Sequence, residues 1–152
     1  MEHPSDSSEQ QAAEAQILAG LVSKCGPLAP KVVTLPAGGQ VKVDGVAADE
    51  SVFVEVFAHQ GPMKGGQPKK VAADALKLIT LRNARPGAKL VLAFADARAA
   101  TNVISGSGWL AEALRTWDVA VEVISIDPTT RADLLAAQAR QRMINPPTSL
   151  EQ

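Results

Sequence analysis

Apolar and polar positions follow three patterns along this chain, and each pattern predicts a kind of element. Near the N-terminus, apolar side chains recur every three or four residues, which is typical of one face of a helix. Three runs rich in valine and phenylalanine follow, separated by the turn sequences PAGG and ADES, and these predict strands. After the third run, helical and strand-like patterns take turns. The predicted elements are a helix from Ser5 or Asp6 to about Lys24, strands 31–35, 40–47 and 52–58, a helix from Pro68 to about residue 84, a strand 89–95, helices 96–104 and 109–117, a strand 119–126 and a helix from Asp127 to about Met143.

This order predicts an α/β fold with a mixed central sheet and flanking helices. Strands joined by short turns pair antiparallel, whereas strands separated by a helix are expected to pair parallel through a crossover. The core is helix–strand–strand–strand–helix–strand, and a further helix–strand–helix follows it. A chain of 152 residues suits one domain, which we assign to residues 1–145, with a C-terminal tail over 146–152.

The strand 52–58 carries one charge, Glu55, in an otherwise apolar run. Alternation puts Phe53, Glu55 and Phe57 on one face and the valines on the other. A strand that is apolar on both faces is expected to lie inside the sheet. A carboxylate there is costly unless it is paired, hydrogen-bonded or metal-bound, so Glu55 indicates a polar site.

A second acid, Asp44, lies in the neighbouring predicted strand, 40–47. Asp44-Gly45 could instead form a hairpin turn, but PAGG and ADES are better spaced as turns. After the third strand, the glycine-rich loop GPMKGGQ leads into the helix that begins at Pro68. Four polar residues of this helix are spaced to form a single stripe. They are Gln67, Lys70, Asp74 and Lys77.

Charge is distributed unevenly, although the net charge of −1 excludes a general polycation. Between His59 and Lys89 there are seven lysines and arginines and one acid, Asp74. This segment is either a phosphate-facing surface or a solvated helix face. Cys25 is the only cysteine, so no intrachain disulfide forms. With no signal-peptide pattern and no apolar run of ~20 residues, we expect a cytoplasmic protein with no membrane segment.

Element order and paired acids resemble the PD-(D/E)xK phosphodiesterase superfamily, which has the restriction-endonuclease-like fold. The resemblance covers residues 6–95. Val43-Asp44 takes the place of the PD pair, and Glu55-Val56-Phe57 takes the place of the (D/E)-x-K triplet. The resemblance implies a nuclease that acts on DNA or RNA with Mg²⁺ or Mn²⁺. It implies that Asp44, Glu55 and the backbone carbonyl of Val56 hold the metal.

Phe57 departs from the family pattern because a lysine stands there in most members and helps position or activate the attacking water. Some members supply the cation from the following helix instead, which implies Lys70 first and Lys77 second. Gln67 matches a glutamine that some members carry at the start of this helix. Other members have lost catalysis, so the second hypothesis is an inactive domain that binds nucleic acid or a protein partner. The third is an unrelated α/β binding protein with structural acids. A homodimer is compatible with each.

Two further polar residues stay undecided. Glu14 lies one turn before the apolar stripe of the first helix, where it either points to water or reaches toward the site. His59 follows the third strand and is more often a capping or surface residue than a ligand at such a position.

Overall fold

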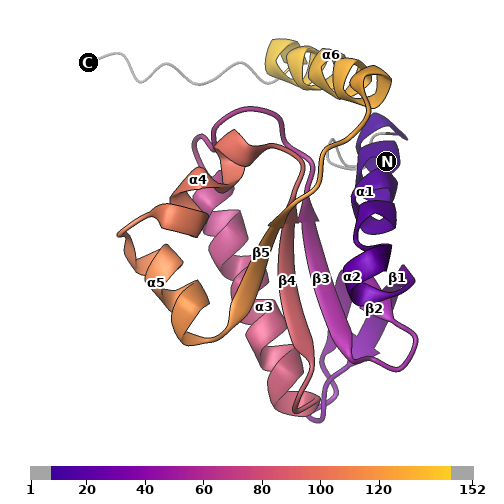
Figure 1. Ribbon diagram of the computed structural model, residues 1–152, viewed down its shortest axis with the longest axis vertical. Helices are drawn as coiled ribbons and strands as arrows, with labels where there is room; N and C mark the ends of the chain where they lie inside the picture. The colour runs from indigo at the N-terminus through magenta and orange to yellow at the C-terminus, as the bar shows by residue number, and fades with distance from the viewer. Residues whose placement is uncertain (1–7, 145–152) are drawn as a thin grey trace.

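A computed structural model describes residues 8–144 of the chain (Figure 1). It is an α/β fold in which helices cover both faces of one five-stranded mixed sheet. The strands are β1 (Leu28–Thr34), β2 (Gln40–Ala47), β3 (Val52–Phe57), β4 (Lys89–Phe94) and β5 (Val119–Val123). The helices are α1 (Ser8–Gly20), α2 (Val22–Cys25), α3 (Gln67–Ala84), α4 (Ala97–Ser105), α5 (Trp109–Thr116) and α6 (Pro128–Ile144). The predicted fold class is therefore confirmed.

The strand order in the sheet is the order in the chain, β1-β2-β3-β4-β5. The first three strands form an antiparallel meander, since short turns join them. β4 and β5 run parallel to β3, because α3 and the pair α4–α5 return the chain across the sheet. β3 lies between β2 and β4, so the prediction of a central third strand is confirmed.

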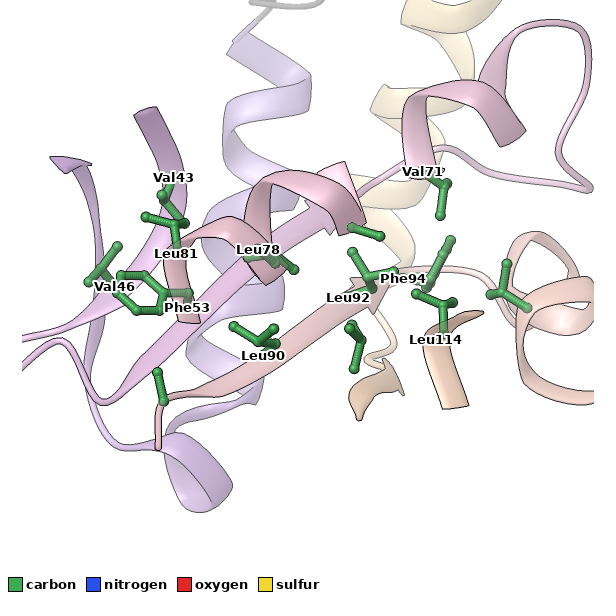
Figure 2. Packing of buried hydrophobic residues seen from close by; sticks show 14 of the residues in the cluster. Val43, Val46, Phe53, Val71, Leu78, Leu81, Leu90, Leu92, Phe94 and Leu114 are labelled. Carbon is green, nitrogen blue, oxygen red and sulfur yellow. The ribbon is translucent and has the colours of Figure 1, made fainter. Parts of the chain in front are cut away.

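Two apolar layers separate the sheet from its helices. Phe53 of β3 packs toward α3, together with Leu78 of that helix and Leu92 of β4 (Figure 2). Val54 and Val56 point to the opposite face and pack with residues of α1 and α6. The predicted alternation along β3 is therefore correct, and it puts Glu55 on the side of α3.

Several boundaries differ from the predictions for local reasons. The first helix is interrupted at Leu21, next to the point where Gly20 packs closely against Ile124. β1 begins at Leu28 rather than residue 31, and its pairing shifts between Ala29 and Lys31. The residue between them is a proline, which has no N–H for the ladder. β5 ends at Val123.

Three predictions fall on segments outside the described residues. They are the capping role of Ser5 or Asp6, the tail 146–152 and the end of the assigned domain at residue 145. Within residues 8–144, no helix combines the length and the apolar character that crossing a membrane requires.

Candidate functional site

A cleft opens where β2 separates from β3. The two strands pair at Gly45–Val54 and Val46–Phe53. Beyond these pairs, the backbone N–H of Val56 donates to Asp44 Oδ2 at 3.0 Å, so a side chain continues the contact between the strands. The cavity has a volume of about 1200 Å³, and α1, β2, β3, α3 and α6 contribute to its walls.

Asp44 and Glu55 meet in this cleft. Continuing the strand register by one residue from Gly45–Val54 places them opposite each other, with their side chains on one face. Glu55 is only 2% exposed. Burial, with a hydrogen bond to Asp44 and its negative charge, raises the pKa of Glu55 to about 8, while Lys77 acts in the opposite direction. The two acids therefore form a close, electrostatically coupled pair.

Lys77 brings its ammonium group to this pair. Its Nζ lies 2.7 Å from Glu55 Oε1 and 3.7 Å from Asp74 Oδ1. It also donates a hydrogen bond of 3.0 Å to the backbone carbonyl of Lys42. The contact with Glu55 is an ion-pair contact without hydrogen-bond alignment, because Oε1 is buried and has no aligned donor.

The expectation that Lys70 would reach Glu55 ahead of Lys77 is wrong. Lys70 Nζ lies 5.1 Å from the centre of the Phe57 ring and 2.9 Å from Asp74 Oδ2, with 63% of its side chain exposed. Desolvation lowers the pKa of Lys70, but the hydrogen bond to Asp74 and the acidic charges around it raise the pKa overall.

The direction of α3 explains why Lys77, rather than Lys70, contacts Glu55. The helix runs back along β3, so its first residue, Gln67, contacts His59 beyond the strand end. Lys70, in the first turn, lies over Phe57. Lys77, two turns later, reaches Glu55. Phe57 is stacked on Phe94 at 5.0 Å between ring centres. An aromatic pair thus fills the place under Lys70.

Gln67 closes the loop before α3. Its Oε1 accepts a hydrogen bond of 2.7 Å from the backbone N–H of Lys64, and its Nε2 lies 3.1 Å from His59 Nδ1. Desolvation and the positive charge of Lys64 lower the pKa of His59. The lowered pKa favours a neutral ring, whose Nδ1 can accept a hydrogen bond from Nε2 of Gln67. His59 and Glu14 both line the cleft.

The donor atoms in the cleft fit a hard divalent cation in kind. Asp44 and Glu55 offer carboxylate oxygens, and one oxygen of Glu55 is buried without an aligned donor. Mg²⁺ is commonly held by one or two carboxylates with several waters. Within residues 8–144, no three acidic, histidine or cysteine side chains gather as a metal-binding group. Val56 directs its N–H to Asp44, and a ligand role for its carbonyl stays a prediction.

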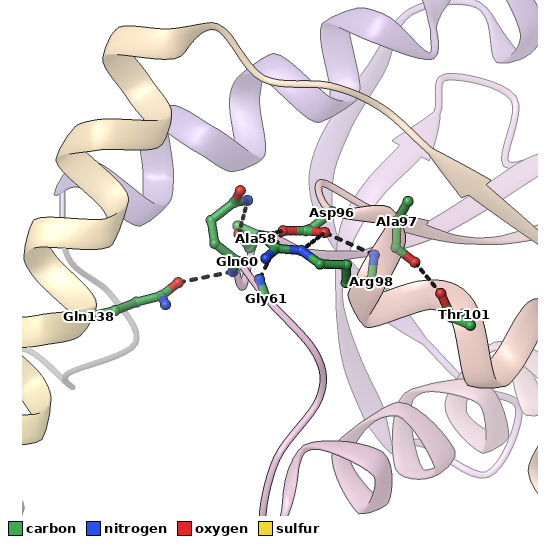
Figure 3. Close-up of polar contacts among 8 residues, drawn as sticks. All are labelled: Ala58, Gln60, Gly61, Asp96, Ala97, Arg98, Thr101 and Gln138. Carbon is green, nitrogen blue, oxygen red and sulfur yellow. Dashed lines mark hydrogen bonds and ion pairs between the residues drawn. The ribbon is translucent and has the colours of Figure 1, made fainter.

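The sequence alone did not reveal the network that fixes the loop after β3. Asp96, two residues after β4, accepts hydrogen bonds of 2.8 Å from the backbone N–H groups of Gly61 and Arg98 (Figure 3). The backbone N–H of Gln60 donates to Gln138 Oε1 of α6 at 3.0 Å (Figure 3). The available signal was an acid directly after an apolar strand.

Comparisons with protein-family models, curated proteins and solved structures find no match to this chain. The resemblance to the PD-(D/E)xK superfamily therefore stays a prediction, which rests on the element order and on the acids of β2 and β3.

Proposed function

We propose that this protein is a divalent-metal-dependent phosphodiesterase that acts on DNA or RNA. The observation that carries the proposal is the pairing of Asp44 with the buried Glu55 in a cleft, with Lys77 Nζ 2.7 Å from Glu55 Oε1. Two carboxylates can hold a metal ion that assists phosphodiester hydrolysis, and a nearby lysine can offset charge on the phosphate. We also propose a cytoplasmic location, which agrees with the single cysteine.

Asp44 and Glu55 would hold Mg²⁺ or Mn²⁺, and the carbonyl of Val56 is the third proposed ligand. When bound, such an ion lowers the pKa of a coordinated water and offsets negative charge on the phosphate. The hydrogen bond from the Val56 N–H fixes one oxygen of Asp44. Glu55 is only 2% exposed, which keeps bulk water away from its carboxyl group.

The cations of α3 have separate roles in this proposal. Lys77, whose ammonium contacts Glu55 in the metal-free protein, would take over the role of the triplet lysine. Lys70 is exposed at the cleft, where its ammonium would contact a substrate phosphate. Gln67 would position the loop and His59 through its two side-chain contacts.

The test is a cleavage assay on single- and double-stranded DNA and RNA with Mg²⁺, Mn²⁺ or EDTA. Asp44→Asn and Glu55→Gln should each lower cleavage at least about 100-fold, since each removes a charged ligand. Asp49→Asn is the matched control because Asp49 lies in the turn before β3 and accepts hydrogen bonds from Ser51. Equal activity in all variants, or cleavage unaffected by EDTA, would overturn the proposal.

A second function, a catalytically inactive domain that binds nucleic acid, is favoured by one specific observation. Phe57 occupies the triplet-lysine position and is stacked on Phe94, so an apolar pair fills that place. The measurement that separates the two functions is binding of labelled DNA and RNA in EDTA at several salt concentrations. Salt-sensitive binding without cleavage under any metal condition would favour the inactive domain. Homodimer formation is a separate proposal that sedimentation of the purified chain would test.

A further inference from the structure

The ammonium group of Lys77 occupies a small site lined by oxygen atoms. Its neighbours are Glu55 Oε1 at 2.7 Å, the carbonyl of Lys42 at 3.0 Å and Asp74 Oδ1 at 3.7 Å. These oxygens come from β3, β2 and α3 respectively, so they are brought together by the fold rather than by local sequence. Only 27% of the Lys77 side chain is exposed.

Glu55 makes the shortest contact with the Lys77 ammonium in this site, and burial holds Glu55 in place. It is 2% exposed, and its Oε1 has no aligned hydrogen-bond donor. An oxygen in this state has an ion-pair contact but lacks the directed hydrogen bond that a buried carboxyl group requires. The Lys77 ammonium lies close enough to stabilise the ionised form of Glu55, yet it leaves the lone pairs of Oε1 without a directed bond.

We propose that the Lys77 ammonium substitutes for the divalent cation. It occupies the cation's site in the metal-free protein and withdraws when a divalent cation binds. This inference depends on the proposed metal-dependent function and describes how the same site is regulated.

Mutual exclusion follows from distance and charge. Mg²⁺ binds carboxylate oxygens at ~2.0–2.1 Å, whereas Lys77 Nζ lies 2.7 Å from Glu55 Oε1. Two cations so close to one buried oxygen repel each other strongly, because the surroundings screen charge poorly. Divalent binding at Oε1 of Glu55 therefore requires that the ammonium move away.

Asp74 provides the position to which Lys77 withdraws. Its carboxylate lies on the same stripe of α3, 3.7 Å from Lys77 Nζ, and already pairs with Lys70 at 2.9 Å. The lysine stem is flexible enough to exchange Glu55 for Asp74 without any movement of the helix. Withdrawal leaves the ammonium within the cleft, where it can face a substrate phosphate.

The first test is a calorimetric titration of the full-length chain with Mn²⁺. Lys77→Met keeps the length of the side chain and removes its charge, so it should bind Mn²⁺ on the order of tenfold more tightly than the wild type. Lys69→Met is the matched control, because Lys69 is an exposed lysine of the same helix. It should change the affinity less than about twofold. Equal affinity in Lys77→Met and the wild type would overturn the inference.

The second test uses the wild type, so it does not depend on the folding of a variant. Magnetic resonance of the lysine side chains should show the Lys77 Nζ signal shifting or broadening as Mg²⁺ is added, while that of Lys69 stays unchanged. An unchanged Lys77 signal, under Mg²⁺ that saturates the backbone shifts at Asp44 and Glu55, would overturn the inference.

Cleavage assays on the same proteins separate this inference from the proposed function. Tighter Mn²⁺ binding in Lys77→Met, without cleavage by the wild type on any substrate, would contradict the phosphodiesterase function and support the role of Lys77 as a substitute cation. Metal-dependent cleavage by the wild type, with equal Mn²⁺ affinity in Lys77→Met, would support the phosphodiesterase function and contradict that role of Lys77. Absence of Mn²⁺ binding in every protein would overturn both.

Discussion

Glu55 is an ionisable residue whose surroundings disfavour its charged form. Its position in β3 buries it among apolar side chains, and its partner Asp44 has the same charge. Lys77 offsets this only in part, because burial and Asp44 still raise the pKa of Glu55. A site that is unfavourable in the metal-free protein is suited to receive a cation, since a cation favours the ionised carboxylate.

The raised pKa of Glu55 predicts a pH-dependent stability. The pKa is about 8 in the folded protein, against an ordinary value of 4.5 for a glutamate. The folded state therefore holds a proton that the unfolded state loses, and stability falls as the pH rises between these values. Glu55→Gln cannot ionise, so it should gain at least about 1 kcal/mol relative to the wild type between pH 5 and pH 8.5, as one pKa unit corresponds to about 1.4 kcal/mol.

Urea unfolding of both proteins in EDTA at the two pH values measures this difference. EDTA is needed because a bound cation would ionise Glu55 in the folded state. A constant difference between wild type and Glu55→Gln across this pH range would show that Glu55 titrates normally.

At the scale of elements, the sequence predicted the types and order of the strands and helices because the hydrophobic patterns are strong. It also placed Asp44 and Glu55 on adjacent strands. It did not predict which lysine reaches Glu55, because that depends on where α3 lies along β3. The rise per residue differs between a helix and a strand. Spacing along the helix alone therefore cannot show that Lys70 lies over Phe57 and Lys77 beside Glu55.

Close packing between α1 and the segment after β5 predicts the effect of a small substitution. A Cβ atom at Gly20 would overlap with Cγ2 of Ile124, a branched side chain that cannot turn away easily. Gly20→Ala should therefore destabilise the protein by about 1–3 kcal/mol, although alanine favours helices. Gly66→Ala is the control, since no atom lies within 4 Å of a Cβ there. Thermal unfolding that ranks Gly20→Ala as stable as Gly66→Ala would contradict this packing.

At the scale of the whole molecule, the cleft is assembled from segments far apart in the chain. α1 and α6, one near each end of the described residues, lie together on one side of the sheet (Figure 1). α3 supplies Lys77 from the other side. The loop after β3 connects these parts through Asp96 and Gln138. Sequence patterns describe elements one at a time, so they could not show that strands and helices from both faces of the sheet converge on one cavity.

Asp96 connects the segment after β4 to the loop beside the cleft. Hydrogen bonds from Arg98, with those from backbone N–H groups, hold the pKa of Asp96 well below its usual range. A lowered pKa contributes stability above the unfolded value of 3.8, and this contribution is lost as the pH falls below it. Asp96→Asn should therefore destabilise the protein by about 1–3 kcal/mol at pH 7 and by less at pH 3.

Hydrogen exchange should also quicken at Gly61, whose amide donates to Asp96 Oδ2. Asp133→Asn, at an exposed position of α6, is the control. A loss of stability equal at both pH values, or unchanged exchange at Gly61, would show that Asp96 does not anchor the loop.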